Sequence, residues 1–306
     1  MKLFFLTTFA LVAFAFNSIL CRMALGTDEI DAASFTAVRL FAGAVTLIIV
    51  SYLFGRKKGG NLSRSERVSD AGNTQAKNLL PTGRVSAFKN RGSWLSAFFL
   101  FAYAICFSFA YLGLTAGTGA LILFSAVQLT MIAVAIFKGE RPTALEWIGL
   151  VVAVGGLVYL VLPGLSSPPL TSSILMASAG IAWGFYTLRG RGSNDPLGDT
   201  TGNFIRTLPF VVLTAIVFLP NIHLSGRGIV LAVLSGALAS GVGYTVWYAA
   251  LKFHSSTRAA VLQLAVPVIA TVGGVVFLSE KASGRLVIAA ALILSGIALT
   301  IVGRKT

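Results

Sequence analysis

The sequence has little charge and almost no cysteine. Only 11% of the 306 residues are charged, whereas 56% are hydrophobic. A soluble chain carries about a quarter charged residues, so too little charged surface is available here for a water-soluble globule. Cys21 and Cys106 are the only cysteines, and both lie in apolar stretches, which excludes a disulfide framework and a four-cysteine metal site. We interpret both as small residues that face lipid or the protein core.

The few charges are mostly basic, and the formal net charge is +14. A basic excess is also typical of nucleic-acid-binding proteins, but these need a folded basic domain with aromatic residues that stack on bases. Here Lys and Arg lie between long apolar runs, as in the cytoplasmic loops of membrane proteins. We therefore expect a lipid bilayer around the chain and no nucleic-acid partner.

Ten apolar runs have lengths near the 20 residues or so that a membrane-spanning helix needs. The first run resembles a signal peptide, because Lys2 precedes Ala13-Phe14-Ala15, but it is longer than the apolar region of such peptides. We expect it to be a helix of the mature protein. The sequence thus predicts an all-α, polytopic membrane protein with ten transmembrane helices. The predicted spans are Leu3–Cys21, Ala32–Phe54, Ser93–Leu112, Gly119–Phe137, Leu145–Leu162, Thr171–Leu188, Phe204–Leu219, Gly228–Ala250, Ala259–Leu278 and Leu286–Val302.

The distribution of basic residues predicts the orientation. If both termini are inside, the outer connections contain only Arg22, Arg227, Lys281 and Arg285, and nearly all other Lys and Arg residues are inside. Positive residues favour the cytoplasmic side, so we predict a multi-pass protein of a bacterial inner (plasma) membrane with cytoplasmic termini. The basic loop 55–91 has too few apolar residues to fold. We expect a linker there that is disordered or lies on anionic headgroups.

A weak internal repeat divides the chain. A shift of 140 residues aligns 93–162 with 233–302 without a gap. A shift of 167 residues pairs Arg22 with Arg189 in the opening helices. Each unit has five predicted helices, an odd number, so the second unit must be inverted relative to the first. We predict the repeats 1–162 and 171–306, and inverted repeats with a site at their interface are typical of secondary transporters.

Four short segments carry a family resemblance. Each half closes its fourth helix with a turn of Gly or Ser, Glu and a basic residue. The turns are Gly139-Glu140-Arg141 and Ser279-Glu280-Lys281, and the helix-opening segments are Phe35-Thr36-Ala37-Val38-Arg39 and Gly119-Ala120-Leu121-Ile122-Leu123. Over essentially its whole length the chain resembles the EamA-like ten-helix transporters of the drug/metabolite transporter superfamily. The resemblance implies alternating access, no cofactor, and a central cavity lined by helices one, three, four, six, eight and nine.

Polar and aromatic side chains inside the spans are the candidate substrate-binding residues. A polar group there needs a partner or water, although a helix–helix hydrogen bond is an alternative for the three amides. Rings with a polar group suit an amphipathic solute. Trp183 lies in the middle of its span, whereas Trp247 lies near the cytoplasmic end, where the interfacial aromatic belt is the stronger interpretation. The candidates are Asn17, Tyr103, Gln128, Trp183, Tyr186, Tyr244, Trp247 and Gln263.

Two arginines inside the spans are expected to be paired, because a buried charge is costly. The repeat makes Arg39 and Arg206 counterparts, as it does Glu140 and Glu280. By depth, we predict that Arg39 approaches Glu280 and that Arg206 approaches Glu140, as structural or gating pairs. Two alternatives stay open: the arginines bind a substrate carboxylate, or each glutamate lies at the positive N-terminal end of the following helix.

The same inventory limits the mechanism. None of the ten runs has an acidic residue in its middle, which argues against a proton–cation exchanger that depends on a membrane-embedded carboxylate. Sequence motifs for hydrolases and metalloproteases are absent, so we expect no enzyme, no catalytic residue and no metal site. We predict a carrier of a small organic metabolite such as an amino acid, with export as the expected direction. A monomer is favoured over a homodimer. The alternative is a membrane scaffold or receptor-like protein without a transport cycle.

Overall fold

The computed structural model describes residues 2–55, 91–139, 143–162, 164, 167–190, 193, 195–251, 253 and 262–303. Helices dominate these residues, because inside a bilayer a helix satisfies its own backbone hydrogen bonds. The helices are α1 (Lys2–Gly26), α2 (Ala32–Gly55), α5 (Trp94–Ala110), α6 (Ala116–Phe137), α7 (Ala144–Val161), α8 (Leu170–Gly190), α9 (Pro196–Val217), η2 (Leu219–Asn221), α10 (Gly226–Leu234), η3 (Ser235–Val242), α11 (Gly243–Leu251), α13 (Ala265–Leu278) and α14 (Gly284–Gly303).

The described residues contain ten helical spans. Seven are long and apolar enough to cross a membrane, and the segment of α10, η3 and α11 counts as one of these. The apolar helices α5 and α13 are shorter, and α8 has 21 residues. The predicted all-α, polytopic architecture is therefore confirmed. The predicted loop 55–91 lies outside the described residues except for its two ends, as do residues 259–261 of the ninth predicted span.

One predicted boundary is wrong in a way that matters for the site. Helix α9 begins at Pro196, whereas the sequence predicted a start at Phe204. The Asp195 carboxylate caps the helix by accepting a hydrogen bond from the Gly198 N–H, and Pro196 is at the first helical position, where proline is favoured. The polar residues between Pro196 and Phe204, among them Asp199 and Asn203, therefore belong to the first turns of a helix and not to a loop.

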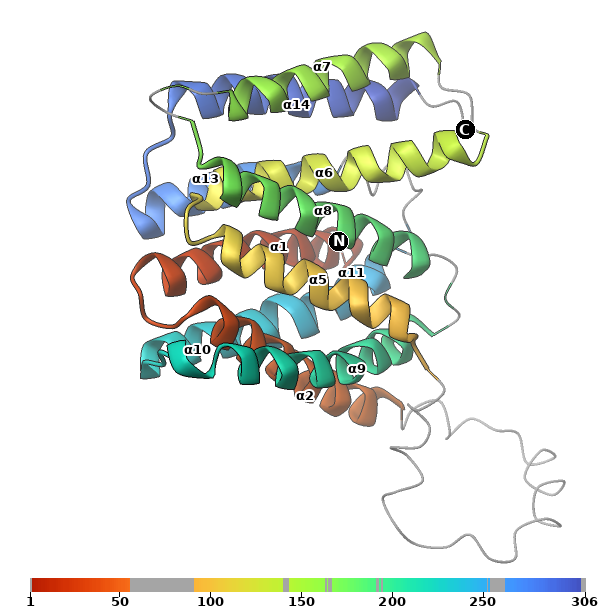
Figure 1. The fold of residues 1–306 in the computed structure, drawn as a ribbon. Helices are drawn as coiled ribbons and strands as arrows, with labels where there is room; N and C mark the ends of the chain where they lie inside the picture. Colours follow the sequence, from red (N-terminus) through yellow and green to blue (C-terminus); the bar gives the residue numbers. More distant parts are fainter. Residues whose placement is uncertain are drawn as a thin grey trace, which may run out of the picture.

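The helix pairings come in matched sets (Figure 1). Helix α5 packs on α8 as α1 packs on the segment α10–α11, and α6 packs on α8 as α13 packs on α1. The pairs α2–α9, α6–α13 and α7–α14 each join one half of the chain to the other, and α7 and α14 lie side by side at one edge of the bundle. This is the pattern that an exchange of two five-helix halves would leave unchanged.

The ends of the helices show that the two halves are inverted. The connection after α1 lies beside the start of α10, where the Ser225 N–H donates to the Glu29 carbonyl. The start of α9, which follows α8 in the second half, lies beside the start of α5, where the Gly92 N–H donates to Asp199. These are opposite ends of the bundle, which we name the Glu280 end and the Arg91 end. The division of the chain at residues 1–162 and 171–306 stays a prediction.

Glycines allow the closest helix contacts in the centre. A Cβ on Gly180 of α8 would lie 2.5 Å from the Leu123 carbonyl oxygen of α6, so this glycine packs against another helix of the same chain. A Cβ on Gly236 would clash with the carbonyl oxygen of Arg39. Gly236 lies in η3, a π-helix between α10 and α11. Such insertions are rare and occur frequently at functional sites.

Candidate functional site

An aromatic cluster occupies the centre of the bundle. The Trp183 ring of α8 lies between Tyr103 of α5 and Tyr244 of α11, with centroid distances of 4.8 and 5.0 Å. Phe14 of α1 meets Tyr244 edge to face at 5.7 Å. Helices from both halves thus supply these rings. They surround a cavity of about 20 Å³, the space of a single water molecule. The residues that line this central cavity are Phe14, Asn17, Ser18, Tyr103, Phe107, Leu123, Phe124, Trp183 and Tyr244.

Arg39 of α2 lies against this cluster and is only 1% exposed. Its Nη2 donates to the Tyr103 hydroxyl at 2.8 Å, and its Nε donates to Ser240 Oγ at 3.3 Å. The guanidinium carbon lies 5.1 and 4.9 Å from the ring centroids of Tyr103 and Phe107, which are cation–π distances. Nη1 is buried without a hydrogen-bond partner.

Asn17 connects the cavity to the π-helix. Its Nδ2 donates to the Tyr103 hydroxyl at 3.1 Å, and its Oδ1 accepts from Ser235 Oγ. Ser235 and Ser240 both lie in η3, so this irregular segment supplies a hydroxyl to Asn17 and another to Arg39. Asn17 therefore lines the cavity and also makes helix–helix hydrogen bonds, and its contact with a substrate stays a prediction.

A second and larger cavity, about 270 Å³, opens at the Arg91 end between α5, α8 and α9. Arg189 donates to Ser96 Oγ at 3.1 Å and to Ser93 Oγ at 3.3 Å. Asp199 accepts from the Gly92 N–H at 3.0 Å and from the Ser193 hydroxyl. Arg189 and Asp199 therefore bring a positive and a negative charge to this cavity, and these hydrogen bonds join each of them to neutral groups. It is lined by Gly92, Ser93, Ser96, Tyr186, Arg189, Gly190, Ser193, Pro196, Asp199, Thr200 and Asn203.

Tyr186 relates the two cavities. Its ring lies 5.3 Å from Trp183 in the central cluster, and its hydroxyl accepts from Asn203 Nδ2 at 3.5 Å in the Arg91-end cavity. Sequence reasoning missed Arg189, Asp199 and Asn203 as cavity residues. The Asp195-Pro196 capping signal could have found the latter two, because it predicts a helix that carries them into the bundle.

The predicted substrate-binding residues fall into three groups. Asn17, Tyr103, Trp183 and Tyr244 line the central cavity, and Tyr186 lines the Arg91-end cavity. Trp247 is buried against Phe14, with a centroid distance of 5.7 Å, and lines neither cavity. Its role in substrate binding and its place in an interfacial belt both stay predictions.

The two glutamines form the third group. Gln128 is buried in α6 and Gln263 is half-buried before α13, and neither lines either cavity. The sequence indicated the spans that carry these amides but not the direction in which each helix turns them.

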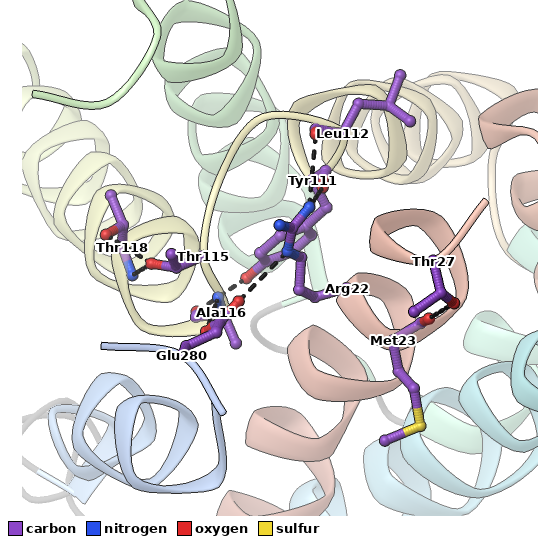
Figure 2. A network of polar contacts seen from close by, with 9 residues as sticks. All are labelled: Arg22, Met23, Thr27, Tyr111, Leu112, Thr115, Ala116, Thr118 and Glu280. Carbon is purple, nitrogen blue, oxygen red and sulfur yellow. Dashed lines mark hydrogen bonds and ion pairs between the residues drawn. The ribbon is translucent and has the colours of Figure 1, made fainter. Parts of the chain in front are cut away.

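At the Glu280 end, the predicted pairing of Glu280 with Arg39 is wrong. Glu280 Oε1 accepts from Arg22 Nε at 3.3 Å, and Oε2 accepts from the Ala116 N–H at the start of α6 at 2.9 Å (Figure 2). Ser279 is in the left-handed conformation, with φ of 54°, and redirects the chain after α13. Glu280 thus lies at the N-terminal end of a helix, as the alternative proposed, but that helix is α6 and not the following helix α14.

Arg22 closes the same network. Its Nη1 donates to the Tyr111 carbonyl oxygen at 3.0 Å, so that α1, the turn between α5 and α6, and α13 are tied at one point (Figure 2). At the other end, Arg206 Nη1 donates to the carbonyl oxygens of Arg91 and Gly202. Glu140 lies outside the described residues, and its pairing with Arg206 stays a prediction. Among the described residues, no cluster of His, Cys, Asp or Glu could hold a metal ion.

Comparisons of the sequence and the fold with known proteins identify the family of this chain. An uncharacterized protein of Pseudomonas aeruginosa is 44% identical over 98% of this chain and 94% of its own length. The threonine/homoserine exporter RhtA of Escherichia coli K12 is 31% identical over 57% of this chain and 60% of its own length. A solved crystal structure shares the fold over 95% of both chains, with a TM-score of 0.59 and 20% identity. The EamA-like transporter family matches residues 170–302, and the chain belongs to this family of membrane transporters.

Proposed function

We propose that this protein is a carrier that moves a small organic metabolite, such as an amino acid, across the inner membrane by alternating access, with export as its direction. The observation that carries the proposal is the central cluster. Asn17, Tyr103, Trp183 and Tyr244 come from four spans and surround one cavity beside the buried Arg39. Polar groups at membrane depth are costly and mark substrate pathways. A scaffold protein would be more stable with an apolar centre.

The difference between the two ends supports a transport cycle. The Glu280 end is tied by the Arg22–Glu280 ion pair, and the Arg91 end holds the larger cavity. A carrier with a site at mid-membrane opens to one side at a time. With the predicted topology, the Arg91 end faces the cytoplasm, so this arrangement corresponds to a carrier ready to load from inside.

The named relatives support the substrate class. RhtA of Salmonella typhimurium LT2, also a threonine/homoserine exporter, is 32% identical over 52% of this chain and 54% of its own length. The similarity covers only about half of each chain, so it supports amino acids as the class to test first and export as the direction.

Reconstitution tests the proposal. Purified protein in liposomes should exchange labelled amino acids in counterflow, and a proton gradient applied in a second series shows whether transport is coupled. Trp183→Ala should lower the rate, because the ring separates Tyr103 from Tyr244. Phe185→Ala on the exposed face of the same helix is the matched control. If wild-type protein transports nothing from a broad set of metabolites, the proposal is wrong.

A further inference from the structure

The central cluster contains a buried positive charge without a visible counter-ion. The described residues form three ion pairs, which involve Arg22, Arg91 and Arg227. Arg39 is in none of them, although it is almost completely buried. A charge removed from water is costly unless it is paired. The groups that contact the Arg39 guanidinium, namely Tyr103, Phe107 and Ser240, are all neutral.

The hydrogen bonds of Arg39 are also incomplete. A guanidinium has five N–H groups in a planar fork. Nε and Nη2 each have one partner, whereas Nη1 has none. The Tyr103 and Phe107 rings compensate part of the desolvation by cation–π contact. A carboxylate is the group that best matches the remaining donors, since it accepts from two N–H groups of one guanidinium at once.

We infer that Arg39 binds the carboxylate of the transported solute, and that the substrate class is an organic carboxylate with an apolar or aromatic body. This inference rests on the proposed transport function. The contacts assign the two parts of such a solute. Tyr103, which accepts a hydrogen bond from Arg39, also lines the cavity in which Trp183 and Tyr244 present their rings. The carboxylate lies at Arg39 and the body of the solute lies against these rings.

The present cavity has room for only about one water molecule, so the solute requires an enlarged centre. The π-helix η3 is the segment whose movement would enlarge it. Ser235 and Ser240 of η3 bind Asn17 and Arg39. Displacement of η3 frees the Arg39 Nε and the Asn17 carbonyl together, so opening of the cavity and exposure of the guanidinium are one event.

A purely architectural role for Arg39 makes different predictions. In that case Arg39 joins α2 to α5 and η3, and its loss destabilises the protein whatever solute is present. Carboxylate binding instead makes the response depend on the chemistry of the solute. The matched control is Arg206, the repeat counterpart, whose Nη1 donates to backbone carbonyls at the Arg91 end, away from the central cavity.

The test uses pairs of probes that differ only in the carboxylate. L-phenylalanine, L-leucine and L-threonine are compared with their α-carboxamides, in thermal stabilisation of detergent-solubilised wild-type protein and in competition for counterflow in liposomes. We expect at least one acid to bind, and its amide to bind at least about tenfold more weakly. Arg39→Gln should abolish this preference, and Arg206→Gln should retain it. Wild-type protein that binds amides as well as acids, or binds none of the acids, overturns the inference.

The wild-type comparison does not depend on the folding of a variant. Arg39→Gln protein that folds and still prefers acids also overturns the assignment to Arg39. The two proposals fail separately. Equal transport of acids and amides contradicts carboxylate recognition and leaves the carrier function intact. A preference for acids in thermal stabilisation, without counterflow of any probe, contradicts the carrier function and supports the site.

Discussion

The two ends of the bundle are built from corresponding parts and differ in how these are tied. The repeat pairs Arg22 with Arg189, one at each end. Arg22 bonds Glu280 and the turn after α5, whereas Arg189 lies in an open cavity and bonds only the hydroxyls of Ser93 and Ser96 among the described residues. Under the proposed alternating access, this difference marks one state of the cycle, and exchange of the two arrangements would move a central site from one side to the other.

The largest expected effect comes from filling the Arg91-end cavity. Ser96 lines it and is 8% exposed. Ser96→Trp should lower counterflow at least about tenfold, because an end that cannot close or admit solute stops the cycle. Ser295→Trp, on the exposed face of α14, is the matched control and should retain full activity. Normal transport by a folded Ser96→Trp variant would show that the cavity is not on the solute path.

The ion pair at the Glu280 end gives the next largest effect, on stability. Glu280→Gln removes the charge that holds Arg22 and the start of α6, and should lower the free energy of unfolding by about 1–3 kcal/mol. The Glu29–Arg227 pair lies at the same end, but Arg227 is 61% exposed. Glu29→Gln should therefore cost less than about 1 kcal/mol. Thermal unfolding in detergent measures the stability of both variants. Equal losses of stability would mean that the Arg22–Glu280 pair contributes no more than the exposed Glu29–Arg227 pair.

A smaller effect tests whether the Arg91 end can form the same tie. The repeat makes Glu140 the counterpart of Glu280, so we predict that Arg189 approaches Glu140 when this end closes. Arg189→Glu and Glu140→Arg should each slow counterflow. The double variant should be faster than the sum of the two single losses predicts, by an amount that corresponds to about 1 kcal/mol of coupling energy. Additive losses would contradict the pairing. Recovery with Arg206→Glu in place of Arg189→Glu would support the pairing predicted from helix depth.

Much of the fold could be predicted because apolar length and an odd helix count constrain it strongly. The number of spans and the family followed from the sequence, and three candidates chosen by residue type, Asn17, Tyr103 and Trp183, line the central cavity. The glutamines at 128 and 263 could not be placed, because a span that is apolar on all sides gives no phase for its helix. The start of α9 was missed because polar residues such as Asp199 and Asn203 resemble a loop until the Asp195 cap is recognised.

The charge pairs show a second limit of the sequence. Position along the helices placed Arg39 and Glu280 at a comparable depth in the membrane. Depth alone does not say which of several residues at that depth contacts Glu280. The left-handed turn at Ser279 sends Glu280 to the start of α6, where Arg22 reaches it, and Arg39 turns instead toward Tyr103 and Ser240. Backbone direction at a single residue decided the pairing.

The smallest predicted effect concerns Asp31, which joins two connections at the Glu280 end. Its Oδ1 accepts from the Ser34 N–H at the start of α2, and its Oδ2 accepts from the His223 N–H at 3.0 Å. Partial burial raises the pKa of Asp31, but these hydrogen bonds outweigh it and hold the pKa below the ordinary value of 3.8. The ionised carboxylate therefore stabilises the folded protein above that value, and this contribution is lost as the pH falls through the lower pKa of the folded state.

Asp31→Asn keeps one acceptor and should cost about 0.5 kcal/mol at neutral pH. The difference from wild type in thermal unfolding should shrink below pH 3.8, because protonated Asp31 then resembles asparagine. Asp28→Asn, at an exposed position in the same turn, should change nothing. A difference that stays constant with pH would mean that the charge of Asp31 contributes no stability.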